Sequence, residues 1–317
     1  MMHMKSSIIF SYDIADEFCI GQVVGLTANS AVVLAESNDT REVNLILLEG
    51  DKYYPRNISK ELPALDKYKI GIKTLMYNIV IFKYNQGFGL LIHDYLYLWD
   101  TFYSNYTEYK IRNHFEKDVH NRVIGPVRAS AIENSNEILV TLSDYDCCLD
   151  VARYYCTLKI QNDYAEWLRP ERQLKLEQFS IETASTRKWS VIQDAVFQNN
   201  MYYIHTIGED MNHYKFGMSC SVLCDNDING KVVKTRNIEK GFGFFSSMKE
   251  YLIVHSLKNK SKLYFYGITK EFEDILSLTP KQNLGSGDKY FIKCDAIENT
   301  LWIYNAQMLN CCKLKIK

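Results

Sequence analysis

The densest group of carboxylates in the sequence surrounds a tyrosine and comprises Asp144, Tyr145, Asp146 and Asp150. Glycoside hydrolysis needs two carboxylates that face each other across the scissile bond. Spacing along the chain does not establish such a pair, and the tyrosine with the adjacent Cys147-Cys148 is more typical of a contact loop. We therefore predict that these four residues contact a partner.

A second group of oxygen ligands, Asp225-Asn-Asp-Ile-Asn-Gly230, matches the first half of a calcium-binding loop. The twelfth position, where a glutamate should close the cage, is Arg236, so a bound cation would face a guanidinium. Asn229-Gly230 between two strands is also a strong hairpin signal. The segment is predicted to be a hairpin turn, with metal binding as the alternative.

The nine cysteines are not spaced like those of a small disulfide-stapled domain. Cys220 and Cys224 would lie about 13 Å apart on a strand, which is too far for both to bind one zinc ion. Cys311 and Cys312 are adjacent, so an extended chain would direct them to opposite faces. Reduced thiols that pack as small hydrophobic groups are therefore predicted.

Motifs of known catalytic classes are absent from the sequence. It contains no G-x-S-x-G elbow, Walker loop or H-E-x-x-H motif, and no dinucleotide-binding glycine motif between a strand and a helix. We therefore predict no catalytic residues, no cofactor and no metal site.

Composition and charge exclude several classes of partner. Hydrophobic residues make up 47% and charged residues 24%, as in a globular protein with a core. The net charge of −1 gives no long-range field for nucleic acid or an anionic membrane. No apolar run approaches the roughly 18 residues of a membrane helix, and the start MMHMKSSIIFSYD lacks a secretory hydrophobic segment. A cytoplasmic protein that binds neither nucleic acid nor membrane is predicted.

A pair of apolar strands joined by a loop recurs along the chain in six copies. The copies are Ala31–Glu36 with Val43–Leu48, Tyr95–Asp100 with Tyr106–Ile111, Glu137–Leu142 with Cys156–Ile160, Met201–Ile207 with Met218–Cys224, Tyr251–Leu257 with Lys262–Ile268, and Thr300–Ala306 with Cys312–Ile316. A further strand and a short polar turn precede each copy. Gly87-Phe-Gly and Gly241-Phe-Gly are expected to open corresponding strands of the second and fifth copies.

The two ends of the chain complement each other. The last copy has no fourth strand after it, whereas Ser6–Asp13 is strand-like and unassigned. If Ser6–Asp13 completes the last sheet, the sheets close into a ring without unpaired ends. Tyr164–Gln178 and Lys270–Leu278 are expected to be outer strands rather than short helices. We predict one domain over 1–317, because no linker or low-complexity segment divides the chain.

The repeated strand pattern resembles that of β-propeller proteins over nearly the whole chain. It lacks the Trp-Asp dipeptide of WD40 blades, the paired glycines of kelch blades and the S-x-D-x-G-x-T-W boxes of sialidase-like propellers, so no subfamily is assigned. The resemblance implies an all-β fold with a single propeller of about six four-stranded blades. It also implies a rigid disc that offers a loop face to a protein partner, or a central funnel to a small ligand.

The predicted partner-binding residues lie on or beside the loops inside the copies, which we expect to share one face. These loops are long and polar in the first four copies, and function concentrates on loops held by a rigid scaffold. In addition to the carboxylate group above, the predicted contact residues are Asp39, Glu42, Trp99, Tyr103, Tyr106, Glu209, Asp210 and His213. For the last three, metal ligation or proton transfer is the alternative role.

These features favour a protein-binding module without catalysis, since an acidic, aromatic-bearing loop face suits a partner with a basic surface. A specific version is an immunity protein that caps a cytosolic bacterial toxin, such as a basic nuclease. One alternative is a hydrolase or lyase that acts on a sugar or lactone with histidines and carboxylates of the central funnel. The other alternative is a scaffold or host-directed effector.

Overall fold

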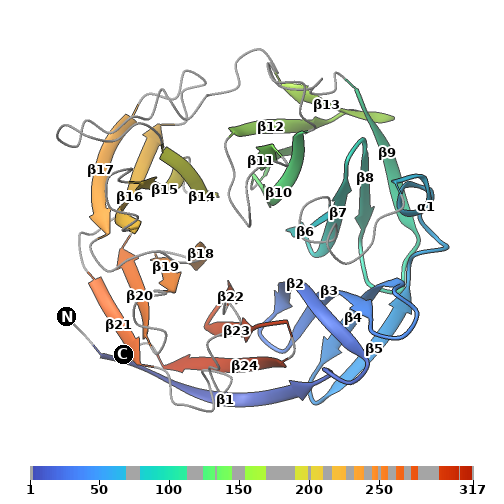
Figure 1. The fold of residues 1–317 in the computed structure, drawn as a ribbon, viewed down its shortest axis with the longest axis horizontal. Helices are drawn as coiled ribbons and strands as arrows, with labels where there is room; N and C mark the ends of the chain where they lie inside the picture. The colour runs from blue at the N-terminus through green and yellow to red at the C-terminus, as the bar shows by residue number, and fades with distance from the viewer. Residues whose placement is uncertain are drawn as a thin grey trace.

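In a computed structural model of the chain, the sheets are arranged radially around a central axis (Figure 1). The residues that the structure describes are 3–68, 79–112, 124–132, 134–144, 154–168, 190–198, 201–209, 216–225, 232–238, 245–248, 251–255, 262–267, 273–277, 293–306 and 308–315. Nearly all of them belong to strands, which form two sheets of eight strands and two of four. The prediction of an all-β chain is confirmed for this part of the sequence.

The first four-stranded sheet consists of β2 (Phe18–Thr27), β3 (Ser30–Ser37), β4 (Val43–Glu49) and β5 (Lys52–Asn57). Consecutive residues of β3 and β4 are buried, because neighbouring elements cover both faces of this sheet. Such strands are rich in Val, Ile and Leu rather than alternating with polar residues. β5 is largely exposed and contains Pro55, which is tolerated in the outermost strand because it has no N–H to pair.

An eight-stranded sheet follows, and it begins after the short helix α1 (Pro63–Tyr68). Its strands are β6 (Ile79–Tyr84), β7 (Gly87–Ile92), β8 (Tyr95–Trp99), β9 (Tyr106–Arg112), β10 (Ile124–Ala131), β11 (Glu137–Asp144), β12 (Tyr154–Ile160) and β13 (Tyr164–Leu168). Within each half the strands are antiparallel. The halves are joined where the outer strands β13 and β9 pair in parallel, with Tyr164 beside Lys110.

The remaining strands form one sheet of four and one of eight. The four-stranded sheet contains β14 (Ser190–Gln198), β15 (Met201–Glu209), β16 (Phe216–Asp225) and β17 (Val232–Ile238). The eight-stranded sheet contains β18 (Phe245–Met248), β19 (Tyr251–His255), β20 (Lys262–Gly267), β21 (Glu273–Ser277), β22 (Lys293–Ile297), β23 (Thr300–Tyr304), β24 (Met308–Lys315) and β1 (His3–Asp13). The predicted outer strands within 164–178 and 270–278 are therefore present as β13 and β21.

The first strand pairs with the last, as the sequence predicted. β1 runs antiparallel to β24, with Ser6 beside Leu314 and Ile8 beside Cys312. Its beginning also pairs in parallel with β21, so β1 joins two groups of strands. The innermost strands contact one another in order, from β2 through β6, β10, β14, β18 and β22 back to β2 (Figure 1).

In the second predicted copy, each strand is assigned one position too early within its group of four. β6 is the innermost strand of its group, so Gly87-Phe-Gly opens the second strand rather than the first. The predicted copy does not include Ile79–Tyr84, so it places β7, β8 and β9 one position too far inward. Gly241-Phe-Gly lies outside the described residues, and the strand that follows it, β18, is the first of its group.

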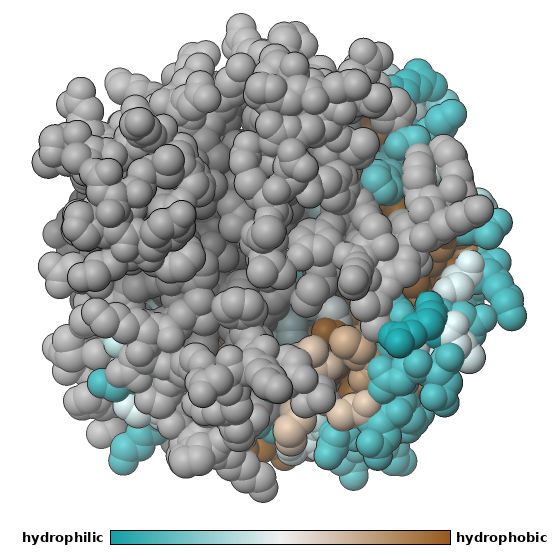
Figure 2. Space-filling view, in the orientation of Figure 1, coloured by the Kyte–Doolittle hydropathy of each residue, from teal (hydrophilic) through white to brown (hydrophobic). Residues whose placement is uncertain are grey.

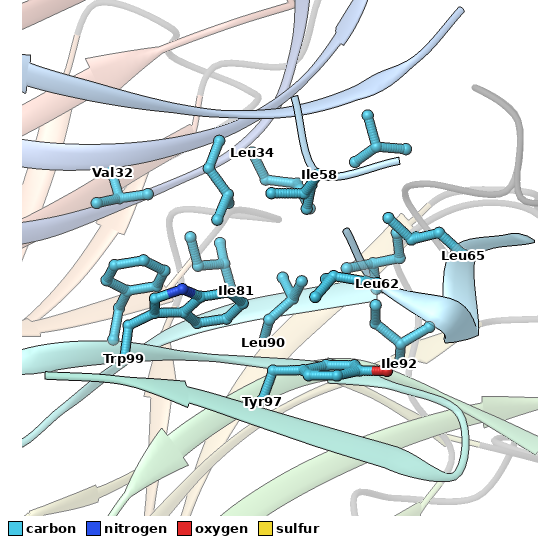
Figure 3. Close-up of a cluster of buried hydrophobic side chains, with 14 of the residues drawn as sticks. Val32, Leu34, Ile58, Leu62, Leu65, Ile81, Leu90, Ile92, Tyr97 and Trp99 are labelled. Atoms are coloured by element: carbon cyan, nitrogen blue, oxygen red, sulfur yellow. The ribbon is translucent and has the colours of Figure 1, made fainter. Parts of the chain in front are cut away.

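The hydrophobic core is divided into clusters between neighbouring groups of strands. One cluster joins β2–β4 to β6–β8, and residues before and within α1 cover its outer side. Figure 3 shows this cluster, with Val32, Leu34, Ile58, Leu62 and Leu65 near Ile81, Leu90, Ile92, Tyr97 and Trp99. Trp99 stacks on Phe88, with 5.0 Å between ring centroids and 10° between ring planes. Cys311 and Cys312 belong to different clusters, which confirms that they face opposite sides of β24.

Polar side chains connect the innermost strands to one another. The side-chain amide of Gln22 in β2 donates to Ile79 O at 3.2 Å and accepts from Ile81 N at 3.0 Å. It thus makes the two hydrogen bonds that the backbone of a neighbouring strand would make with β6. Lys83 Nζ donates to Leu26 O at 2.9 Å. β2 and β6 are edge strands, each paired with its own sheet on one side only, and these side chains satisfy backbone groups on the other side.

Several smaller predictions can be compared with the described residues. β16 and β17 are antiparallel neighbours, as the predicted hairpin requires, while residues 226–231 between them lie outside the described part. Cys220 and Cys224 both lie on β16. Among the described residues, no helix is long and apolar enough to cross a membrane.

Candidate functional site

Carboxylates gather where the turn after β1 meets the connection between β3 and β4. Asn38 holds these two segments together. Its backbone N–H donates to Glu17 O at 2.9 Å, and its side-chain amide donates to Ala15 O at 2.7 Å and Asp16 O at 3.2 Å. The side chains of both segments are therefore carried on backbone that is fixed in the folded state.

We call this region the acidic surface, and its members are Asp13, Asp16, Glu17, Asp39 and Glu42. The first four side chains are exposed and Glu42 is partly buried. Two cations lie among them, since Lys60 is 3.5 Å from Glu42 and Arg41 adjoins it in sequence. Carboxylates outnumber cations, so the surface attracts basic groups.

Two of these carboxylates are held by hydrogen bonds. The hydroxyl of Tyr53 donates to Glu17 Oε1 at 2.5 Å, and this bond raises the pKa of Tyr53. Hydrogen bonds with Thr40 and Asn57 lower the pKa of Glu42, and Asn57 Nδ2 is 2.7 Å from Glu42 Oε2. Both carboxylates are therefore fixed in position, and Glu42 remains charged at neutral pH.

The connection between β8 and β9 displays an aromatic ring. Tyr103 is 70% exposed, whereas Phe102 beneath it is buried and meets its ring edge-on at 5.2 Å between centroids. Ser104 Oγ accepts from Thr101 N at 3.1 Å and donates to Thr101 O at 2.8 Å. Arg56 Nη1 donates to Phe102 O at 2.9 Å. The loop therefore presents Tyr103 in a fixed position.

The segment between β5 and α1 connects this loop to the acidic surface. Arg56 forms an ion pair with Glu61, with 2.7 Å between Nη2 and Oε2, and Tyr106 donates to Glu61 O at 3.0 Å. Lys60, between these residues, contacts Glu42. Figure 2 shows mainly hydrophilic side chains along the part of the rim that Figure 1 assigns to β5, α1 and β9.

The structure supports exposure for some predicted contact residues and contradicts it for Trp99. Asp39 and Tyr103 are exposed, and Glu42 is partly so. Trp99 is 1% exposed because it packs in the core, so its predicted role as a surface contact is wrong. Tyr106 is partly buried, and its hydroxyl is engaged with the backbone of Glu61.

The prediction that the loops of the first four copies share one face is also wrong for the second copy. The 100–105 loop joins the third and fourth strands of its group, whereas the 38–42 loop joins the second and third. The two loops therefore leave opposite ends of corresponding strands. The error follows from the one-strand shift in the second copy.

The other predicted contact residues lie outside the part of the chain whose side chains the structure describes. They are Asp144 and Glu209, which end β11 and β15, and Tyr145, Asp146, Asp150, Asp210 and His213. Their predicted roles stay predictions.

Sequence reasoning missed Asp13, Asp16 and Glu17. The predicted contact residues come from the loops inside the copies, but the connection from an outer strand to the next innermost strand emerges at the same strand ends as the 38–42 loop. The run Asp13-Ile-Ala-Asp-Glu17 was therefore the signal that could have found them.

Two ionisable groups of the innermost strands bond to backbone atoms of β2. Asp295 Oδ2 accepts from Gly25 N at 2.7 Å, and burial raises the pKa of Asp295 despite this bond. Lys83, bound to Leu26 O, has its pKa lowered by burial. Within the described residues, no three His, Cys, Asp or Glu side chains gather in a way that could hold a metal ion.

The sheets are radial and mostly antiparallel, and their innermost strands contact one another in sequence order. This arrangement identifies the fold. The chain is a β-propeller. No family model matches the propeller, and no curated protein matches it significantly.

Solved structures similar to the propeller include the β-propeller domain of Cps50 (Swd1) from Myceliophteria thermophila, with 8% identity, a TM-score of 0.48 and coverage of 97% of this chain and 99% of that one. Hsv2 from Kluyvelomyces marxianus has 8% identity and a TM-score of 0.42, over 91% of this chain and 89% of its own. A subtype N11 neuraminidase-like protein of A/flat-faced bat/Peru/033/2010 (H18N11) has 10% identity and a TM-score of 0.39, over 97% and 94%. Likenesses at this level transfer no activity, ligand or partner, and no subfamily is assigned.

Proposed function

We propose that this propeller is a non-catalytic module that binds a protein partner with a basic surface in the cytoplasm. More specifically, we propose an immunity protein that caps a bacterial toxin. The observation that carries the proposal is the acidic surface, connected through one segment to the exposed ring of Tyr103. Opposite charge speeds encounter between proteins, and a large aromatic side chain provides contact area.

The scaffold that we propose for this role has six blades of four strands, with β1 as the outer strand of the last blade. The pairing of β1 with β24 and the contacts among the innermost strands support it. A stiff scaffold lowers the conformational entropy that binding would otherwise cost. The hydrogen bonds of Asn38 and Ser104 act in the same way within the loops.

Reversal of charge at Asp39 tests the electrostatic part of the proposal. We expect Asp39→Lys to slow association with the partner that co-purifies from the native cell by about tenfold at low salt, because steering is lost. The difference should shrink at about 0.5 M salt, where the charges are screened. Asp163→Lys is the matched control, since Asp163 is also an exposed aspartate, in the turn between β12 and β13. Equal association rates for the two variants would contradict the proposed surface.

Truncation of Tyr103 tests the aromatic contact. We expect Tyr103→Ala to weaken partner affinity by about 30-fold, the effect of losing a central aromatic contact of about 2 kcal/mol. The thermal midpoint of the free protein should change little, because the ring is 70% exposed. Ile9→Ala, at a large exposed side chain on β1, provides the control. A clean monomer that binds no protein but turns over a sugar or lactone would replace the proposal with the enzymatic alternative.

A further inference from the structure

A buried carboxylate lies directly beneath the acidic surface. Glu36, near the end of β3, is 0% exposed, and neither of its carboxylate oxygens has a hydrogen-bond partner. A buried carboxylate without such partners is unfavourable for folding. Packing of the sheet therefore gives no reason for a glutamate at this position.

The cation that accompanies Glu36 is weakly attached. Arg41 Nη1 lies 3.6 Å from Glu36 Oε1, beyond hydrogen-bond distance, and the Arg41 side chain is 65% exposed. Arg41 has a φ of 61°, a region that residues other than glycine rarely adopt. Because most of the Arg41 side chain is in solvent, its displacement from Glu36 would remove little packing from the core.

Neither Cys19 nor Arg41, the two groups nearest in effect on Glu36, fully compensates the negative charge of its carboxylate. Cys19 in β2 lies opposite Glu36 in register, and burial raises the pKa of this thiol, so it stays neutral. Burial also raises the pKa of Glu36, while Arg41 opposes that change. A second cation that reached Glu36 would gain the pairing that Arg41 provides only in part.

We propose that Glu36 is the receptor for one cationic side chain of the partner, an arginine or a lysine that displaces Arg41. The proposal rests on the proposed function, and it specifies one contact between the partner and the residue beneath the acidic surface. A guanidinium can donate to both carboxylate oxygens at once, which satisfies the two acceptors that lack partners in the free protein. Released Arg41 would extend into solvent beside Asp39 and Glu42.

The test removes the resident cation and supplies a small one. Arginine amide, lysine amide and citrulline amide, each acetylated at the α-amine so that only citrulline amide is uncharged, are titrated into the wild-type protein, Arg41→Ala and the double variant Arg41→Ala/Glu36→Gln. We expect Arg41→Ala to bind arginine amide at least about tenfold more tightly than the wild-type protein does, which corresponds to about 1.4 kcal/mol. The double variant and the citrulline ligand should show no binding. The readouts are the shift of the Glu36 carboxyl carbon resonance and the rise in thermal midpoint.

Arg41→Gly serves as a second variant, because glycine adopts the φ of 61° without strain and the loop should fold unchanged. Equal affinity of arginine amide for the wild-type protein and both single variants would overturn the proposal. So would binding that persists after Glu36→Gln. The assay contains no partner protein, so its failure is distinguishable from failure of the partner to co-purify.

Discussion

Gly87→Ala is expected to destabilise the propeller by about 3 kcal/mol or more, at the upper end of the effects of overpacking. A Cβ at position 87 would lie 2.7 Å from Asp100 O and closer still to Trp99 O. Both neighbours are backbone atoms, so no side-chain rotation can relieve the clash. β7 would have to move away from β8 beside the stacked pair of Phe88 and Trp99.

The midpoint of urea unfolding, followed by tryptophan fluorescence, measures this loss. Gly50→Ala is the matched control, because Gly50 has a φ of 62° but nothing within 4 Å of a Cβ. The control should lose only about 1 kcal/mol, from backbone strain alone. If the two variants unfold at the same urea concentration, the close approach of β7 to the end of β8 is incorrect.

Removal of residues 1–13 is expected to abolish cooperative unfolding at 25 °C. The deletion takes away buried Met4 and Tyr12 and leaves β24 as an unpaired edge over Cys312 and Leu314. Each large buried side chain contributes about 2–5 kcal/mol, while a whole domain has only about 5–15 kcal/mol of stability. The truncated chain should therefore lack a single sigmoidal transition in circular dichroism.

A circular permutant separates loss of pairing from loss of covalent continuity. The permutant joins residue 317 to residue 1 through a flexible linker and opens the chain in the turn between Gly50 and Asp51. It keeps every strand and should unfold cooperatively near the wild-type midpoint. A truncated chain that unfolds like the wild-type protein would show that β1 adds little to the fold.

The pairing of β1 with β24 could be predicted by counting strands along the sequence. Ser6–Asp13 was a strand without a partner, and the last copy was a sheet without an outer strand. The phase of the second copy could not be read in the same way. Ile79–Tyr84 is followed by a turn in which Asn85 has a φ of 51°, but the next residue is Gln86 rather than glycine, so the Asn-Gly hairpin signal is absent.

The candidate site was predictable only where a residue's exposure did not depend on strand phase. Asp39 lies in a loop in any alignment of the strands, and its exposure was therefore predicted correctly. Trp99 is the last residue of β8. Whether β8 is the second or the third strand of its group determines which side chains surround Trp99. The sequence gives no sign that Glu36 is buried, since a glutamate at a strand end normally faces solvent and its burial arises from tertiary packing.

The pairing of β1 with β24 has a consequence for biosynthesis. Ser11 donates to the side chain of Asn310, which lies 299 residues further along the chain. At ribosomal elongation rates, on the order of tens of seconds separate the appearance of the two residues. During that interval the nascent chain carries an unsatisfied strand with apolar Ile8, Ile9 and Phe10. β1 therefore cannot dock on β24 until residues 308–315 have been synthesised, and an apolar strand exposed for that time favours aggregation.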